Sequence, residues 1–242
     1  MIRALVAVIF WSIYVPVAAL IAFPWTFISG KIDLIWQLGM WGARAGVWLS
    51  GVRTRVVGLE RLDPKQPYIF MSNHVSNIDP PVIVPLLRRR MSILAKKELF
   101  SIPVLGMALR IGQIVPVDRR NRDAAIESVK RAVEVLRSGS SMLVYPEGTR
   151  TRNGRLLPFK KGPFHMALEA GIPVVPLTIV GAYEIWPKGK FAIHPGTATL
   201  IVHAPIDPKQ FGNREELTEA VRRQIESGLP EKYRTATAWT GR

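Results

Sequence analysis

The sequence predicts an α/β domain, built on a mostly parallel but mixed sheet flanked by helices, with an N-terminal two-helix membrane anchor. Two observations support this prediction. From about residue 54 onward, short β-branched runs alternate with helical stretches that end at Gly or Pro, the pattern of a sheet buried between helices. Before that point the chain is almost uncharged and rich in tryptophan. We therefore expect residues 1–50 to form the anchor and residues 51–242 to form the α/β domain.

The anchor is predicted from two apolar runs. No charged residue occurs between Ala4 and Gly30, and the second run, residues 34–49, carries only Arg44. Tryptophan is typical of the interface between a bilayer and water. Five of the seven tryptophans lie in this part of the chain: Trp11, Trp25, Trp36, Trp41 and Trp48.

Two features argue against one simple membrane span. Pro16 and Pro24 should kink or end a helix, and a charge such as Arg44 is costly inside a bilayer. We therefore expect two helices, hinged near residues 29–33, that enter one leaflet. A single full span, a buried helical pair of a soluble protein and a cleaved signal peptide are the alternatives.

The α/β domain is expected to contain seven strands and four helices. Apolar, β-branched runs predict strands at residues 53–57, 67–71, 91–95, 114–117, 141–145, 174–180 and 198–202. Apolar residues at helical spacing, with Gly or Pro at the ends, predict helices at residues 81–87, 121–137, 162–170 and 214–228. In the second of these helices the apolar residues fall on one face: Ala125, Val129, Ala132, Val133 and Leu136.

Charge narrows the choice of partners. The 33 Lys and Arg residues exceed the 18 Asp and Glu residues and give a formal net charge of +15. Such a surface favours nucleic acid, anionic lipid or a phosphorylated substrate. No basic strand interleaved with aromatic residues and no recognition helix is evident, so we expect no nucleic-acid partner. The absence of cysteine excludes disulfides and thiolate chemistry.

The stretch MSNHVSNIDPP, residues 71–81, places His74 and Asp79 five residues apart between a predicted strand and a double proline. That separation is about 140° around a helix, so one helix face cannot pair them. Ser and Asn residues around His74 favour a tight turn instead, in which the two side chains can meet. A carboxylate bonded to one ring nitrogen makes the other nitrogen a better base. The alternative is a histidine in a turn with Asp79 as a helix cap.

A second polar loop follows the predicted strand at residues 141–145, and it reads Pro-Glu-Gly-Thr-Arg. Gly148 permits a close approach of the backbone, Thr149 offers a hydroxyl, and Arg150 presents a planar fork that matches phosphate oxygens. Glu147 is expected to orient Arg150 or to contact a substrate hydroxyl. The alternative is a solvated basic loop.

Taken together, these loops resemble the glycerolipid acyltransferase family, and within it the lysophosphatidate acyltransferases. The resemblance rests on NHVSNID at residues 73–79 and PEGTR at residues 146–150. Three further blocks are similar to the family: GQIVPVDR at residues 112–119, VVPLT at residues 174–178 and the segment at residues 95–106. The similarity covers about residues 67–181 and implies the family's α/β fold.

The resemblance also implies site roles. His74 would act as a general base and Asp79 would orient it. Arg119 and Arg150 would clamp a phosphate, with Lys96 a weaker candidate. The other substrate-binding candidates in the matching motifs are Asn73, Ser76, Glu147, Gly148 and Thr149. We predict no cofactor. We also predict no metal site, because His165, His194 and His203 are scattered at no ligand-like spacing.

By the same resemblance, the acyl acceptor is lysophosphatidic acid and the donor is acyl-ACP or acyl-CoA. The expected partners include a bilayer with anionic lipids, and the expected location is the inner membrane with the catalytic domain facing the cytoplasm. Two alternatives stay open. One is a relative in the family that acylates glycerol-3-phosphate or another lysolipid, and the other is a non-catalytic, membrane-tethered binder of anionic lipid.

Overall fold

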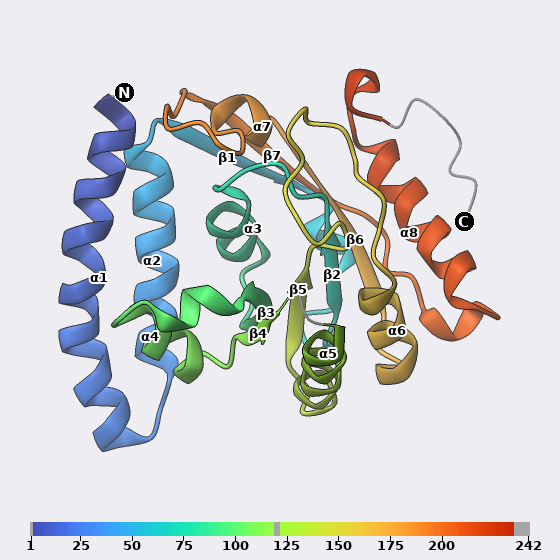
Figure 1. The fold of residues 1–242 in the computed structure, drawn as a ribbon, viewed down its shortest axis with the longest axis horizontal. Coiled ribbons are helices and arrows are strands. Elements are labelled where there is room, and N and C mark those ends of the chain that lie inside the picture. The colour runs from blue at the N-terminus through green and yellow to red at the C-terminus, as the bar shows by residue number, and fades with distance from the viewer. Residues whose placement is uncertain (1, 119–121, 235–242) are drawn as a thin grey trace.

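A seven-stranded sheet separates two layers of helices in the computed structural model, which describes residues 2–118 and 122–234 (Figure 1). The strand order is β1-β7-β6-β2-β5-β3-β4. Every neighbouring pair is parallel except β6 and β7, which are antiparallel. The predicted class, a mostly parallel mixed sheet flanked by helices, is confirmed.

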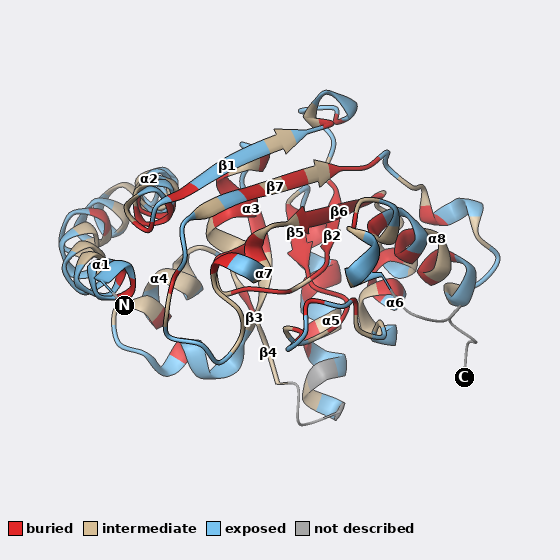
Figure 2. Cartoon of the chain, turned by 90° about the horizontal axis from the view of Figure 1, so that it is seen from above, coloured by how far each residue is buried: buried red, intermediate tan, exposed pale blue. Residues whose placement is uncertain are grey.

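The seven predicted strands are all present, with bounds that agree to within two residues. They are β1 (Val52–Val57), β2 (Ile69–Ser72), β3 (Met91–Lys96), β4 (Val115–Val117), β5 (Ser141–Val144), β6 (Val174–Val180) and β7 (Gly196–Val202). The central strands β2, β5 and β6 are buried on both faces, whereas β1 is exposed along one side (Figure 2). Continuous apolar sequence is what such doubly covered parallel strands require.

The four predicted helices of the domain correspond to α3 (Asp79–Leu87), α5 (Arg122–Arg137), α6 (Lys161–Ala170) and α8 (Arg214–Ser227). Besides short 3-10 helices, the described chain has four further α-helices: α1 (Ile2–Ser29), α2 (Asp33–Leu49), α4 (Leu105–Ile111) and α7 (Ala182–Ile185). The last two were not predicted. Both are short, so their apolar residues do not repeat often enough to show a helical period.

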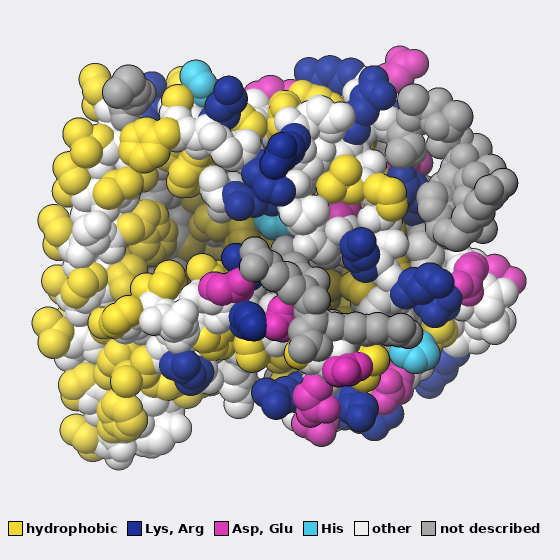
Figure 3. Space-filling view, in the orientation of Figure 1, with side chains coloured by type: hydrophobic (Ala, Val, Ile, Leu, Met, Phe, Trp, Pro, Cys, Tyr) yellow, Lys and Arg dark blue, Asp and Glu magenta, His cyan; other side chains and the backbone are white. Residues whose placement is uncertain are grey.

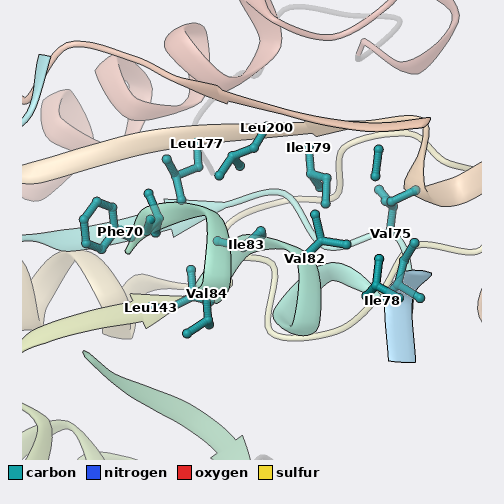
Figure 4. Packing of buried hydrophobic residues seen from close by; sticks show 14 of the residues in the cluster. Phe70, Val75, Ile78, Val82, Ile83, Val84, Leu143, Leu177, Ile179 and Leu200 are labelled. Carbon is teal, nitrogen blue, oxygen red and sulfur yellow. The ribbon is translucent and has the colours of Figure 1, made fainter. Parts of the chain in front are cut away.

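The sheet buries a separate core on each face. Phe70 of β2 faces α3, where it packs with Ile83, Leu143 and Leu177 (Figure 4). Its neighbours Ile69 and Met71 face the other way and join the apolar sides of α5, α6 and α8. This alternation follows from the two-residue period of a strand. The apolar face predicted for α5 is buried at Ala132, Val133 and Leu136.

Helices α1 and α2 form an antiparallel pair on the α3 side of the molecule (Figure 1). They turn at residues 30–32, where a hinge was predicted, and Gly30 adopts a φ of 67°. The small residues Gly42 and Gly46 let the pair approach closely. A Cβ at Gly42 would lie 2.3 Å from the Tyr14 ring, and one at Gly46 would lie 2.9 Å from Trp11.

Pro16 and Pro24 were predicted to kink or end the first helix, and they do not end it, because α1 continues through both prolines to Ser29. Each proline removes one N–H donor from the helix, which by itself leaves the other backbone donors and acceptors in place. Among the described helices, α1 is the one whose length and composition suffice to cross a bilayer, with a mean hydropathy of 2.4 and 11% of that window buried. Its outer face is apolar and uncovered, as the left margin of Figure 3 shows.

A matched pair of glycines tests the turn that follows β6. Gly181 and Gly139 have similar φ values, 85° and 89°, but a Cβ at Gly181 would lie 2.2 Å from the Thr197 carbonyl oxygen, whereas one at Gly139 would meet nothing within 4 Å. We expect Gly139→Ala to lower the free energy of unfolding by about 1–2 kcal/mol through backbone strain alone. Gly181→Ala should cost about 1–3 kcal/mol more through overlap. Denaturant unfolding in detergent measures the free energy of unfolding of both variants. Equal losses in the two variants would contradict the close approach of the Thr197 carbonyl oxygen to Gly181.

Candidate active site

Two loops meet at the carboxyl edge of the sheet. One loop, residues 73–78, follows β2, and the other, residues 145–160, follows β5. Because β2 and β5 are adjacent and parallel, their carboxyl ends lie at the same edge, where α/β folds build their sites. The loops are joined directly, since the Thr151 N–H donates to the His74 carbonyl oxygen at 3.0 Å.

His74 and Asp79 are paired as the sequence predicted. The distance from His74 Nδ1 to Asp79 Oδ2 is 2.7 Å, and the imidazole is 12% exposed while the carboxylate is fully buried. An ionised Asp79 requires a proton on Nδ1, so Nε2 is the unprotonated nitrogen that can accept one. The pair therefore has the arrangement of a general base and the carboxylate that orients it.

The same carboxylate oxygen organises the loop. Asp79 Oδ2 also accepts the backbone N–H groups of Val75 and Ser76, each at 2.8 Å. Asp79 is the first residue of α3, where a negative charge is favoured by the helix dipole. Three donors and a helix N-terminus thus stabilise Oδ2, whereas Oδ1 of the same carboxylate is buried without a hydrogen-bond partner among the described residues. The alternative, Asp79 as a helix cap, is wrong: the N-cap of α3 is Ile78 without a side-chain cap bond, and Asp79 bonds to N–H groups that precede the helix.

The His74 ring stacks on Tyr145, with centroids 3.9 Å apart and planes inclined by 17°. Tyr145 follows β5 directly, and burial raises the pKa of its phenol well above the ordinary value, with the nearby Asp79 acting in the same direction. The phenol therefore stays neutral and offers the imidazole a flat apolar support. From the sequence, Tyr145 is predicted only as the last residue of a strand, without a role in the site.

Asn73 and Ser76, both predicted among the substrate-binding residues, use their side-chain polar atoms to hold the loop. The Asn73 side chain exchanges two hydrogen bonds with the backbone of Ile179 in β6, at 2.8 and 3.0 Å. Ser76 Oγ donates to the Trp186 carbonyl oxygen at 2.7 Å. Both residues are buried, so their polar atoms are used inside the protein.

Glu147 also differs from expectation, because it contacts the backbone of His74 instead of orienting Arg150. Its Oε1 accepts the His74 N–H at 2.6 Å, and its Oε2 accepts the Leu157 N–H at 2.8 Å. Burial raises the pKa of Glu147 to about 8, while the two N–H donors oppose this shift and the charge of Asp79 adds to it. With 2% of its surface exposed, Glu147 is out of reach of a substrate hydroxyl.

The remaining residues of the PEGTR loop lie nearer the surface. Arg150 donates from its guanidinium to Asn77 Oδ1, in the loop that carries His74. Gly148 adopts a φ of 70°, which favours glycine, and Thr149 is exposed with its hydroxyl 3.0 Å from Lys188 Nζ. The structure therefore brings His74 and Arg150 together through Asn77.

Two further candidates are less well placed. Lys96 is exposed at the end of β3, where its ammonium lies 3.1 Å from Glu98. No hydrogen bond or ion pair between described residues joins Lys96 to the two loops. Arg119, the other predicted phosphate ligand, lies outside the described residues.

The profile of the acyltransferase family matches residues 53–180, just over half of the chain. The chain belongs to this family. The match starts in β1 and ends with β6, so it includes both loops of the site.

Relatives and a solved structure agree with this assignment. A 1-acyl-sn-glycerol-3-phosphate acyltransferase of Limnanthes douglasii is 38% identical and covers 66% of this chain and 57% of its own length. A 1-acyl-sn-glycerol-3-phosphate acyltransferase of Borreliella burgdorferi is 32% identical, and the match covers 75% of this chain and 74% of that protein. The crystal structure of the 1-acyl-sn-glycerophosphate acyltransferase PlsC from Thermotoga maritima is 28% identical, with a TM-score of 0.80 over 94% of this chain and 95% of that one. The chain spans less than two thirds of the length of several plant relatives.

Two apolar cavities lie between this acyltransferase site and the N-terminal helices. One, of about 440 Å³, is lined by α1 and α2 and extends to Asn77 and Trp186. The other, of about 370 Å³, lies between α2, α3 and α4. Trp11 and Pro81 line both cavities, which are therefore neighbours. In Figure 3 a hollow on this face separates the apolar margin of α1 and α2 from a group of Lys and Arg side chains.

Glu147 gives the site a testable pH dependence. The folded state holds the Glu147 proton more tightly than the unfolded chain, whose ordinary value is 4.5. The stabilisation that protonated Glu147 gives the folded state is therefore complete below the unfolded pKa of 4.5. It is lost as the pH rises through the folded pKa of about 8. We expect Glu147→Gln to reduce the fall in free energy of unfolding between pH 5 and pH 9, measured by denaturant unfolding in detergent. The control is Glu169→Gln, which removes the same charge from an exposed position on α6. If the free energy of unfolding falls with pH equally in both variants, Glu147 is not the source of the pH dependence.

Proposed function

We propose that this acyltransferase transfers an acyl group from a thioester donor to the sn-2 hydroxyl of lysophosphatidate and so forms phosphatidate. The relatives named above carry that activity in their names. The observation that supports the proposal most directly is that the loop carrying His74 also supplies Asn77, the partner of Arg150. One acceptor molecule can then present its phosphate to Arg150 and its hydroxyl to His74.

In the proposed mechanism, His74 Nε2 removes the proton from the sn-2 hydroxyl as its oxygen attacks the thioester carbonyl carbon. The carbon–sulfur bond then breaks, and the leaving thiolate takes the proton from His74. Asp79 keeps Nδ1 protonated and stabilises the imidazolium that forms between these steps. General base catalysis of this kind contributes about 10²–10⁴ to the rate.

Arg150 is the proposed ligand of the acceptor phosphate, with Arg119 as a second ligand and Lys96 as a weaker candidate. A phosphate held by a guanidinium fork fixes the position of the hydroxyl relative to His74, which is positioning catalysis. Gly148 and Thr149 would contact the same headgroup from the PEGTR loop, since Thr149 is exposed beside Arg150.

The proposed donor is acyl-ACP or acyl-CoA. Both are anionic, so the net charge of +15 would favour their approach. The apolar cavities beside Asn77 and α3 are the proposed place for an acyl chain, because they are lined by apolar side chains and reach the loop of His74 at Asn77 and the start of α3 at Pro81. No cofactor takes part in the proposed reaction.

Residues 1–50 are the proposed membrane anchor, and residues 51–242 the proposed acyltransferase domain. The product carries two acyl chains and must leave into a bilayer. Helix α1 presents uncovered apolar side chains along its length, including Ile13, Leu20 and Ile28. We place the enzyme at the inner membrane, bound to anionic lipid, with the catalytic domain facing the cytoplasm where thioester donors are made.

Replacing His74 tests the catalytic assignment. We expect His74→Ala to remain folded, to bind lysophosphatidate, and to lose at least about 100-fold in acyl transfer, because the base is gone. The matched control is His165→Ala, which removes an exposed histidine from α6 and should keep wild-type turnover.

The acceptor is identified by a transfer assay in which lysophosphatidate, glycerol-3-phosphate and a lysophospholipid are offered in parallel. Full turnover by His74→Ala would refute the general-base role, and a wild-type protein that binds lysophosphatidate without transfer would be a binder.

Charged substitutions on α1 test the anchor. We expect the double variant Ile13→Lys and Leu20→Lys to bind phosphatidylcholine vesicles more weakly than wild type, because each lysine costs about 2.5–3.5 kcal/mol near the centre of a helix in the bilayer. Sedimentation with the vesicles measures the bound fraction, and a zwitterionic lipid avoids attraction of the new charges. The control exchanges two exposed apolar residues of the domain, Val57→Lys and Ile126→Lys. Equal binding by the two double variants would exclude α1 as the anchor.

A further inference from the structure

Lys188 lies beside the site on a segment that the family profile does not cover. The segment, residues 186–190, follows α7 and forms a tight turn in which the Lys190 N–H donates to the Pro187 carbonyl oxygen at 3.2 Å. The turn is fixed to the loop of His74 at Ser76. Ser76 forms a β-bridge with Pro187, and its hydroxyl donates to the Trp186 carbonyl oxygen at 2.7 Å. Lys188 therefore has a defined position relative to His74.

The side chain of Lys188 reaches across to the PEGTR loop. Its Nζ lies 3.0 Å from Thr149 Oγ1 and 3.2 Å from the Arg150 carbonyl oxygen. Lys188 is half-buried, whereas Lys190, two residues further on, is exposed. Holding a lysine side chain in one conformation costs rotamer entropy, which its contacts must offset. Lys188 is thus not a freely solvated lysine, and its ammonium has a third N–H beyond the two acceptors named.

The positive charges of Arg150 and Lys188 are not neutralised by any carboxylate among the described residues. Arg150 donates to the neutral amide oxygen of Asn77, and Lys188 donates to a hydroxyl and a carbonyl oxygen. Within residues 2–118 and 122–234, no carboxylate forms an ion pair with either side chain. Both cations have neutral partners only, so an anion that reached both side chains would gain two charge-assisted contacts without displacing a carboxylate.

We propose that Lys188 binds the phosphate of the acyl acceptor together with Arg150. This proposal rests on the proposed function and adds a ligand from outside the motifs of the sequence. Arg150 offers a planar fork and Lys188 a compact point charge, so the two cations can contact different oxygens of one phosphate monoester. Because Ser76 links the segment of Lys188 to the loop of His74, the phosphate and the base keep a fixed separation.

Binding measurements in detergent test this proposal without requiring turnover. The probes are a short-chain lysophosphatidate and the monoacylglycerol with the same chain, which lacks the phosphate. We expect Lys188→Ala to bind lysophosphatidate about 10- to 100-fold more weakly, as for the loss of one hydrogen bond to a charged group, and to bind monoacylglycerol like wild type. Arg150→Ala sets the scale for a phosphate ligand, and Lys190→Ala is the matched control that should bind both lipids like wild type.

The outcomes separate this inference from the proposed function. If Lys188→Ala binds lysophosphatidate like Lys190→Ala, Lys188 is not a phosphate ligand. Equal weakening for both lipids would also overturn the proposal, since it indicates a role in the fold alone. Transfer assays on the same proteins report separately on function. A wild-type protein that binds lysophosphatidate through Lys188 without acylating it would retain this inference and lose the proposed activity.

Discussion

The site depends on one buried carboxylate oxygen. Asp79 Oδ2 accepts hydrogen bonds from His74 Nδ1 and from the N–H groups of Val75 and Ser76. A charge without such donors would be too costly to bury, and these donors would be unsatisfied without the charge. The oxygen therefore sets the ring orientation of His74 and the path of the loop at once. Through Ser76 it also sets the position of the turn that carries Lys188.

The second constraint is the order of strands in the sheet. With β2 between β5 and β6, the loop of His74 lies beside the PEGTR loop on one side and the end of β6 on the other. Glu147 bonds to the first loop from β5, and Asn73 bonds to Ile179 of β6. A base held from both neighbouring strands keeps its position as substrates enter and leave, which is what catalysis by positioning requires.

Helix α3 connects this chemistry with the apolar helices. It begins at Asp79, packs its apolar residues on β2 and β6, and contacts α2 on its other side. Arg44, the one charge predicted to be costly in the second apolar run, uses its guanidinium to donate to the Pro85 carbonyl oxygen of α3. The N-terminal pair is thus attached to the element that supplies the carboxylate of the dyad.

The sequence by itself determined what lies within a few residues along the chain. The turn formers between His74 and Asp79 predicted their pairing, and the apolar run of residues 174–180 predicted β6, because local pattern sets backbone conformation. Tertiary structure alone decided which distant groups meet. Glu147 lies 73 residues from His74, and Lys188 lies 39 residues from Thr149. Those contacts depend on strand order and on the turn after α7, and neither leaves a periodic signal in the sequence.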